Sequence, residues 1–358
     1  MKEKFKKSII PITKIIAFII IFIFVFTYLT YLMKPDEVSL RNINGYYGEK
    51  KNSLDMVYIG GSACFVYWAP LQAFEDEGIA SYSYGAYVVQ AELYKYLIKE
   101  ALKTQDPELI VIDARAFQYR ENRLPEEVHY RNFLTGMSFS LNKLEFINEN
   151  VEKNIGQDTL PYIFDIIKYH RSFFSDNINP NALSMMFHTY KNPLKGFYFV
   201  PEVAMLEEYD NKTDERKKIA KESEDILLDL LDYIKTTDSD YLFVVSPYQE
   251  TKEQRMQFNY IEDIITEAGY NFVDANLYYD EMNLDFEGDL YNFNHVNIYG
   301  AEKYTSFISD YIKENYDLPD RRDDSNYKEW YDLLDNWHEQ VDMTKKTIDD
   351  KKKELLNE

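Results

Sequence analysis

Five short segments, separated by stretches with helical periodicity, constrain the fold of this chain more than any other feature. They cover 57–59, 81–84, 107–113, 241–245 and 271–274. The continuous apolar runs among them are typical of strands buried on both faces of a parallel sheet. Because helical segments alternate with them, right-handed crossovers are expected. We therefore predict an α/β fold, a flavodoxin-like sheet of about five parallel strands in the order 2-1-3-4-5, with helices on both faces.

The N-terminus has the pattern of a membrane anchor. An uncharged run covers 15–33, and the basic residues before it are Lys2, Lys4, Lys6, Lys7 and Lys14. At about 1.5 Å per residue the run nearly matches a hydrocarbon core of about 30 Å. Basic flanks favour the cytoplasmic side. We expect 1–14 in the cytoplasm, 15–33 across the cell membrane as a single-pass anchor, and an extracytoplasmic main domain.

A cleaved signal peptide is the alternative interpretation of this run. Signal peptides usually have a shorter hydrophobic region that ends in small residues. The end of the run, with Tyr28, Tyr31, Leu32 and Met33, has no such cleavage site. The sequence therefore favours an uncleaved anchor and the bilayer as a partner.

The rest of the chain divides by pattern into a connector, a domain and a tail. We predict a polar connector over 34–54, one globular domain over 55–320 and a charged helical tail over 321–358. The tail has one apolar stripe, which could pack on the domain or on a partner. Within the domain, 114–201 breaks the strand–helix alternation. We interpret it as a helical insertion over the carboxyl edge of the sheet, where lids lie in such folds.

Composition excludes some classes of function. The formal net charge of -22 argues against nucleic acid as a partner. The single cysteine, Cys64, allows no intrachain disulfide, and we interpret it as a small buried apolar group. His129, His170 and His188 have no ligand partner at metal-binding spacing. We predict no metal site and no cofactor.

Two short motifs at the ends of the domain predict chemistry. The first strand stops at Gly60 and Gly61, and Ser62 follows at the carboxyl end of the strand, where open α/β sheets bind ligands. Near the end of the domain, His295 lies in a loop just before a helix predicted over 301–316. A serine needs a nearby base to act as a nucleophile, so Ser62 and His295 form a candidate pair.

These motifs resemble those of the SGNH/GDSL hydrolases. The likeness is carried by the strand that ends in Gly-x-Ser62, by Gly85 after the second strand, and by His295 in a D-x-x-H-like position. It is greatest to membrane-anchored extracytoplasmic members from Gram-positive bacteria, similar to teichoic-acid D-alanylation and alginate-acetylation proteins. The resemblance spans 55–320, although the middle of the domain is not diagnostic.

The resemblance implies a function and a set of site residues. Ser62 would be the nucleophile and His295 the base, and the backbone N–H groups of Ser62 and Gly85 would bind the oxyanion. The implied activity is that of a cell-surface acyl esterase or O-acyltransferase acting on ester-linked acyl groups of a cell-envelope polymer. A membrane-bound O-acyltransferase is the implied protein partner.

Two departures from the family pattern leave alternatives open. The family's asparagine donor after the third strand is absent, and Arg115 could replace it. The aspartate of D-x-x-H is Asn292 here, whereas Asp289 lies six residues before His295. The site then uses Asn292 or Asp289 to orient His295, works as a dyad, or is inactive. We predict Asn292 from its spacing. A non-catalytic binding or scaffold subunit with the hydrolase fold is the alternative function.

Overall fold

The chain folds around one five-stranded parallel sheet. The computed structural model describes residues 2–118, 125–174 and 178–357, with side chains from residue 12 onward. The strands are β1 (Met56–Gly60), β2 (Ser81–Gly85), β3 (Leu109–Asp113), β4 (Asp240–Val245) and β5 (Asn271–Asp274). They pair in the order β2-β1-β3-β4-β5, and every pairing is parallel. The predicted α/β class with a five-stranded parallel sheet is confirmed.

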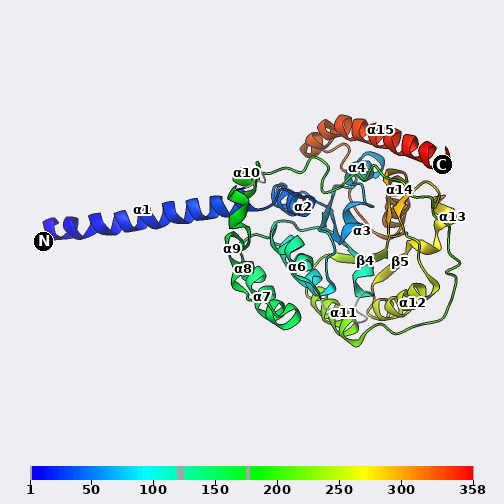
Figure 1. Ribbon diagram of the computed structural model, residues 1–358, viewed down its shortest axis with the longest axis horizontal. Coiled ribbons are helices and arrows are strands. Elements are labelled where there is room, and N and C mark those ends of the chain that lie inside the picture. Colours follow the sequence, from blue (N-terminus) through cyan, green and yellow to red (C-terminus); the bar gives the residue numbers. More distant parts are fainter. Residues whose placement is uncertain (1, 119–124, 175–177, 358) are drawn as a thin grey trace.

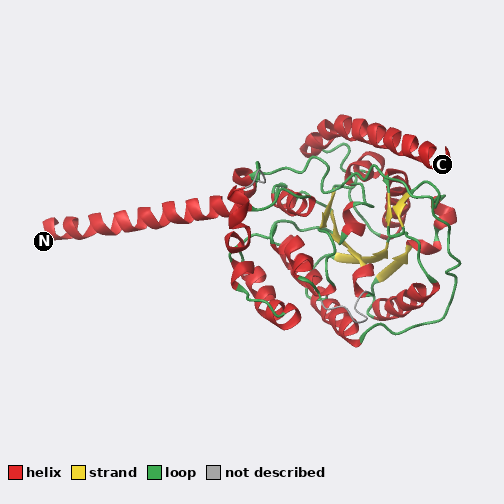
Figure 2. Ribbon diagram, in the orientation of Figure 1, coloured by secondary structure: helices red, strands yellow, loops and turns green. Residues whose placement is uncertain are grey.

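Helices cover both faces of this sheet. One face carries α4 (Pro70–Glu77), α14 (Ile298–Asn315) and α15 (Lys328–Asn357), which contact one another. The opposite face carries α5 (Tyr94–Ala101), α11 (Lys221–Ile234) and α12 (Lys252–Glu267); Figure 1 shows α11 and α12 below the sheet and α4, α14 and α15 above it. The strands are almost completely buried between these layers. Figure 2 shows the sheet at the centre of the domain with helices around it.

The other elements of the domain are short. They include α2 (Val38–Tyr47), α3 (Ser62–Phe65), α6 (Glu127–Leu134), α7 (Leu141–Asn150), α8 (Leu160–Ile163), α9 (Asp165–Tyr169), α10 (Ala182–Met186), α13 (Tyr279–Met282), and the 3-10 turns η2 (Ala114–Phe117) and η4 (His170–Phe174). A two-stranded antiparallel hairpin, β6 (Leu290–Asn292) and β7 (His295–Val296), was not predicted from the sequence.

The predicted connector over 34–54 is part of the domain. Helix α2 lies in it and packs against β2. Leu40, Ile43 and Tyr46 bury one face of this helix, and the side chain of Asn42 donates to the carbonyl of Gly196 at 2.9 Å. The segment looked polar because its asparagines and glycines are counted as solvent-exposed in sequence patterns. Here Asn42, Asn44 and Gly45 are buried, and both asparagine side chains donate hydrogen bonds to backbone carbonyls, as buried polar groups generally do.

The tail over 321–358 is also part of the domain. Trp330 stacks on Phe74 of α4 with ring centroids 4.9 Å apart, and Trp337 packs against Phe199. Arg321 forms an ion pair of 2.7 Å with Asp55, the residue before β1. Of the two options left open, the apolar stripe of the tail takes the domain as its partner, so no boundary falls at residue 320.

The insertion over 114–201 is helical, and its two ends lie near the carboxyl edge of the sheet: η2 follows β3 directly, and the backbone N–H of Tyr198 bonds to the carbonyl of Phe65 in α3 at 2.8 Å. Its later helices pack elsewhere: α7 contacts α5, while α9, η4 and α10 contact α1. The expectation of a lid over the carboxyl edge is therefore wrong for α7 to α10. The charged amphipathic pattern over 210–236 predicts one helix, but α11 begins only at Lys221. The preceding chain runs along α12, with the N–H of Lys217 bonded to the carbonyl of Met256.

Helix α1 (Lys2–Met33) projects from the domain as a single long rod (Figure 1). Within it, Ile12–Met33 is the one span among the described residues that is long and apolar enough to cross a membrane. A candidate anchor is therefore present where the sequence predicted one.

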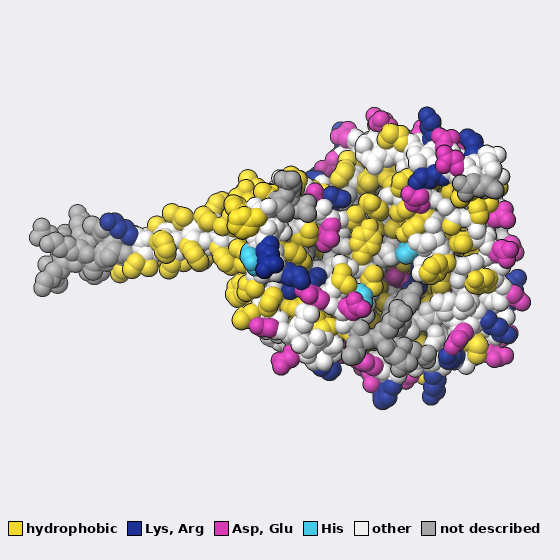
Figure 3. Space-filling view, in the orientation of Figure 1, with side chains coloured by type: hydrophobic (Ala, Val, Ile, Leu, Met, Phe, Trp, Pro, Cys, Tyr) yellow, Lys and Arg dark blue, Asp and Glu magenta, His cyan; other side chains and the backbone are white. Residues whose placement is uncertain are grey.

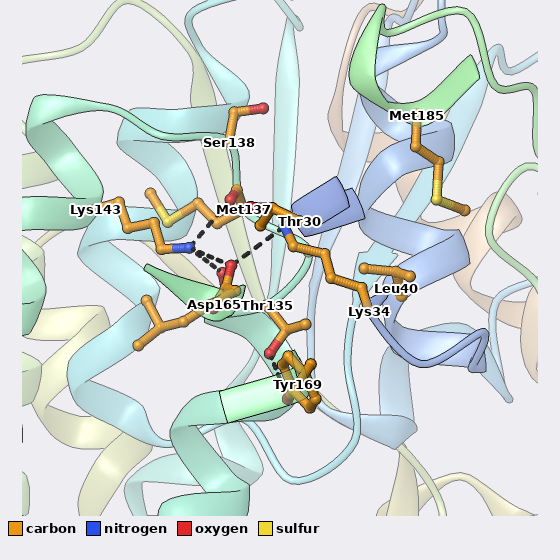
Figure 4. A network of polar contacts seen from close by, with 12 residues as sticks. Thr30, Lys34, Leu40, Thr135, Met137, Ser138, Lys143, Asp165, Tyr169 and Met185 are labelled. Atoms are coloured by element: carbon orange, nitrogen blue, oxygen red, sulfur yellow. Dashed lines mark hydrogen bonds and ion pairs between the residues drawn. The ribbon is translucent and has the colours of Figure 1, made fainter. Parts of the chain in front are cut away.

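A buried cluster of charges ties the end of α1 to the insertion (Figure 4). The carboxylate of Asp165 lies 3.2 Å from Lys34 Nζ and 3.2 Å from Lys143 Nζ, and Arg131 is 3.6 Å away. All four side chains are nearly inaccessible to solvent. Asp165 is the shared counter-charge of Lys34 and Lys143, whereas Arg131 also pairs with Glu127 at 3.1 Å, so the junction depends on Asp165 more than on any single cation.

Replacing Asp165 by asparagine should therefore destabilise the protein strongly. The amide keeps the shape of the side chain but leaves Lys34 and Lys143 buried without a counter-charge, a loss of about 3–5 kcal/mol. Urea unfolding of the full chain in detergent measures the difference. The matched control is Asp225→Asn, which removes an exposed ion pair with Lys221 and should leave the midpoint unchanged. Equal midpoints for both variants would contradict the role given to Asp165.

Candidate active site

Ser62 lies at the carboxyl edge of the sheet because β1 stops at a glycine. Strand β1 ends at Gly60, and Ser62 is the first residue of α3. A Cβ on Gly60 would lie 2.8 Å from the Cβ of Asp113 and 3.0 Å from that of Cys64. Only glycine lets β1 and β3 end this close together. The turn therefore brings the Ser62 hydroxyl to the edge where parallel sheets bind ligands.

The hairpin β6–β7 brings His295 to the same place. Phe293 and Asn294 form its turn, and His295 begins the returning strand. The Oγ of Ser62 and the Nε2 of His295 are 2.7 Å apart, although 233 positions separate these residues in the chain. This is the hydrogen-bond distance that a general base needs to take the serine proton.

Asn292 fixes the tautomer of His295. Its Oδ1 lies 3.1 Å from His295 Nδ1 and also accepts the backbone N–H of Asn294 at 2.8 Å. Since a backbone N–H can only donate, it requires the amide oxygen, not the nitrogen, at this position. The amide oxygen then accepts a hydrogen bond from the protonated Nδ1. This leaves Nε2 unprotonated and able to accept a hydrogen bond from the Ser62 hydroxyl. The asparagine thus selects the productive tautomer.

Asp289, the alternative orienting residue, is engaged elsewhere. Its buried carboxylate lies 2.7 Å from Lys303 Nζ and accepts the backbone N–H of Asp285 at 2.6 Å. No described hydrogen bond joins it to His295. Of the two candidates, the structure brings Asn292 to the histidine and leaves Asp289 as a support of the preceding loop.

His295 is held neutral by its surroundings. Burial, together with the nearby positive charge of Arg115, lowers the pKa of His295 from 6.5 to about 3. The ring also stacks on Tyr291, with centroids 5.3 Å apart and planes 11° from parallel. A neutral imidazole can accept a proton at any ordinary pH, but the amide of Asn292 brings no negative charge to stabilise the imidazolium.

Arg115 positions the histidine loop. Its Nη1 donates to the carbonyl of Asn294 at 3.0 Å, and its guanidinium lies over the ring of Tyr248 at 4.3 Å. The hydroxyl of Tyr67 reaches the same carbonyl at 2.7 Å. One described bond of the Arg115 guanidinium thus holds the loop that carries His295, while other contacts reach Ser246 and Tyr248 after β4. Sequence reasoning, which offered Arg115 only as an oxyanion donor, missed this role.

A cavity of about 280 Å³ opens beside Ser62 and His295. Its wall comes from Gly61 to Ala63, from the loop 88–90, from Asp113, Arg115 and Ala116, and from His129, Asn294 and His295. Among the described residues, no group of three or more His, Cys, Asp or Glu side chains lies together as a metal site would require. The cavity therefore offers a serine, two imidazoles, a carboxyl group, a guanidinium and backbone groups as its chemistry.

Gly85 does not line this cavity, which corrects its assignment as an oxyanion donor. A Cβ on Gly85 would lie 2.7 Å from the carbonyl oxygen of Gly60 and 3.2 Å from Cys64 Sγ. The residue is a glycine because the ends of β1 and β2 pack directly against each other. The loop 88–90 takes its place at the wall, and Val88 adopts a φ of 51°, a strained value for a β-branched residue.

Two further residues at the site had no predicted role. His129 lies in the wall of the cavity while its Nδ1 accepts the N–H of Glu126 at the start of α6. Tyr291, beside Asn292 in the sequence, forms the stacking partner of His295. The one sequence signal for Tyr291 is an aromatic residue next to the motif. This signal does not stand out, because tyrosines occur throughout this chain.

Comparisons with known proteins do not assign the chain to a family. A scan against protein-family models found no match, and a search of curated proteins found none. The functional argument therefore rests on the geometry of this site.

The depressed pKa of His295 predicts how stability depends on pH. The unfolded chain binds a proton at His295 near pH 6.5, whereas the folded chain does so only near pH 3. As far as His295 decides it, the free energy of unfolding is therefore highest above pH 6.5 and decreases as the pH falls toward 3. Between pH 7.5 and pH 5 the loss should be about 2 kcal/mol, from about 1.36 kcal/mol per pH unit. Urea unfolding of the native chain and of His295→Gln at both pH values measures it. An equal pH dependence in the two proteins would contradict the shift.

Proposed function

We propose that this protein is an SGNH-type acyl esterase or O-acyltransferase that acts on ester-linked acyl groups of a cell-envelope polymer. One observation carries the proposal: Ser62 Oγ, His295 and Asn292 Oδ1 lie in a continuous hydrogen-bonded line at the carboxyl edge of a parallel sheet. A serine, a base and an orienting acceptor in this order are the parts of a nucleophilic acyl-transfer centre. The cavity beside them supplies space for an acyl ester.

The residues divide the reaction into two steps. His295 Nε2 takes the Ser62 proton as Oγ attacks the ester carbonyl carbon. The tetrahedral intermediate collapses, the C–O bond to the alcohol breaks, and the imidazolium returns the proton to that alcohol. Water, or the hydroxyl of an acceptor, then loses its proton to His295 and attacks the acyl-Ser62 carbonyl. Collapse of this second intermediate releases the acyl product and restores Ser62.

The oxyanion is proposed to bind to backbone N–H groups. Ser62 opens α3, and the first N–H groups of a helix have no acceptor within it. The strained loop at Val88 lies across the cavity and presents further backbone groups to the same space. One preorganised donor of this kind typically contributes about 10²–10³ in rate.

The proposed place of action follows from α1. A membrane-spanning α1 with its basic end in the cytoplasm would hold the catalytic domain outside the cell, next to envelope polymers. A membrane-bound O-acyltransferase is the proposed partner that would supply or accept acyl groups, by the family resemblance alone.

Loss of the Ser62 hydroxyl should abolish ester hydrolysis. The full chain in detergent is expected to cleave p-nitrophenyl acetate, and Ser62→Ala should lower kcat/KM by about 10³-fold or more, since the nucleophile is removed. His129→Gln, a histidine of the same cavity without a described bond to Ser62, is the matched control and should keep most activity, unlike His295→Gln. Equal rates for the native chain and Ser62→Ala would rule out Ser62 as nucleophile.

Restoring the carboxylate at Asn292 should change the pH profile. Asn292→Asp places a negative charge against Nδ1, which raises the pKa of His295 and strengthens it as a base. We expect kcat/KM at pH 8 to stay equal or rise, and the activity to fall below neutral pH, whereas the native profile stays flat from pH 8 to pH 5.

The control for this experiment is Asp289→Ala. It should lower stability, because Lys303 loses its partner. It should not shift the pH at which kcat/KM falls on the acidic side of the profile, called the acidic limb. A shift of the limb by Asp289→Ala and none by Asn292→Asp would make Asp289 the third member of the site.

A second candidate is a non-catalytic binding subunit that keeps the hydrolase fold. The observation that favours it is the pKa of about 3 at His295, because a base this weak gains little from taking the serine proton. In that case native chain and Ser62→Ala should be equally inactive toward aryl esters, and Asn292→Asp should create activity where none existed.

A further inference from the structure

Large apolar side chains surround the place where α1 meets the domain. They come from the ends of α9 and α10 and from η4, the segments of the insertion that contact α1. We call this group the collar; it consists of Phe164, Ile167, Phe173, Phe174, Leu183 and Phe187, each at least 40% exposed. Figure 3 shows hydrophobic side chains gathered at the base of the projecting helix.

The length of α1 places the collar at the depth of the lipid chains. The span Ile12–Met33 is about 33 Å long at about 1.5 Å per residue, close to a hydrocarbon core of about 30 Å. Only its part over 12–25 is exposed all round, and this part covers about 21 Å at the same rise per residue. The exposed rod alone is too short for the bilayer.

The rest of the span packs against the collar. Phe24 lies beside Phe187, with ring centroids 6.4 Å apart, and Phe26 meets Phe164 edge-on at 6.2 Å. Whatever surrounds residues 24–33 at this depth therefore also surrounds the collar. Lys34 ends the span, and its ion pair with Asp165 fixes the start of α9 against it.

Sliding the membrane toward the N-terminus does not remove this overlap at low cost. A core of about 30 Å spans about 20 helical residues, so a shift that ends it at residue 25 would bring Lys6, Lys7 and Lys14 into the hydrocarbon, where charged side chains are strongly disfavoured. Tilting the helix shortens the height that the exposed part covers. Both adjustments leave the collar at or within the edge of the hydrocarbon.

The sequence of the collar segment fits an interface between lipid and water. The exposed basic residues of this segment lie between exposed apolar ones. The basic residues are Lys168, His170 and Arg171, and the apolar residues are Ile167, Phe173 and Phe174. Interfacial membrane segments combine basic residues on one side with phenylalanine and leucine on the other. The basic groups would then reach the phosphates while the apolar groups enter the acyl chains.

We propose that the collar is inserted into the bilayer leaflet nearest the domain, with lipid acyl chains as its occupant. The protein is then held by two elements, the spanning helix and the collar, and cannot swing freely about residue 34. Because the insertion contributes Ala116 to the cavity wall and packs α9, η4 and α10 against α1, the collar also fixes the height of the cavity above the membrane. This inference does not rest on the proposed catalytic function.

Spin labels on the collar test the proposal in the full chain reconstituted in phosphatidylcholine vesicles. Phe174→Cys and Leu183→Cys lie in separate segments and are each labelled with a nitroxide; the native Cys64 is completely buried and should take up no label. Both labels should be accessible to oxygen and lose their accessibility to a water-soluble nickel chelate. Met343→Cys on α15, an equally exposed apolar position far from α1, is the control and should stay accessible to the chelate.

Two outcomes would overturn the proposal. Chelate accessibility at Phe174 and Leu183 equal to that at Met343 would show that the collar lies in water. Dipolar broadening that disappears when labelled chains are diluted with unlabelled ones would show that a second copy, not lipid, covers the collar. Protection from the chelate without broadening supports insertion into lipid.

Discussion

The close approach of three parallel strands at their carboxyl ends determines most of this structure. Gly60 and Gly85 face each other across the β1–β2 pair, and neither position has space for a side chain. Asp113 at the end of β3 fills the other side of Gly60. The chain after β1 turns sharply through Gly61, and Ser62 carries the first side chain after this turn. The location of the candidate nucleophile is thus a consequence of strand packing.

The loop of His295 depends on a cation that also weakens the histidine as a base. Arg115 holds the Asn294 carbonyl and so fixes the turn of the β6–β7 hairpin. Its positive charge adds to burial in lowering the pKa of His295. A carboxylate at position 292 would offset that charge, whereas Asn292 supplies orientation alone. The site therefore has precise geometry and an electrostatic environment that disfavours the imidazolium, and the balance between these decides between an enzyme and a binding subunit.

The periphery of the domain is built from segments that look detachable in the sequence. Helix α2 seals one side of β2, and α15 lays Trp330 and Trp337 onto the core. Both the segment that follows α1 and the end of the chain are therefore packed on the sheet domain. The charge cluster at Asp165 does the same for the insertion, so that α1, the insertion and the cavity wall are mechanically connected.

The sequence alone determined the parallel sheet, its five strands, the candidate anchor and the pair Ser62 and His295, because these depend on local pattern: apolar runs, a glycine turn, a long uncharged helix. It also favoured Asn292 over Asp289, since a short loop can fold the side chain three residues before a histidine back against its ring. Only the tertiary structure decided the rest. Whether Gly85 serves packing or chemistry, where the tail docks, and what Arg115 holds depend on contacts between residues far apart in the chain. The pKa of His295 likewise arises from burial and from a charge 180 positions away, which no local pattern contains.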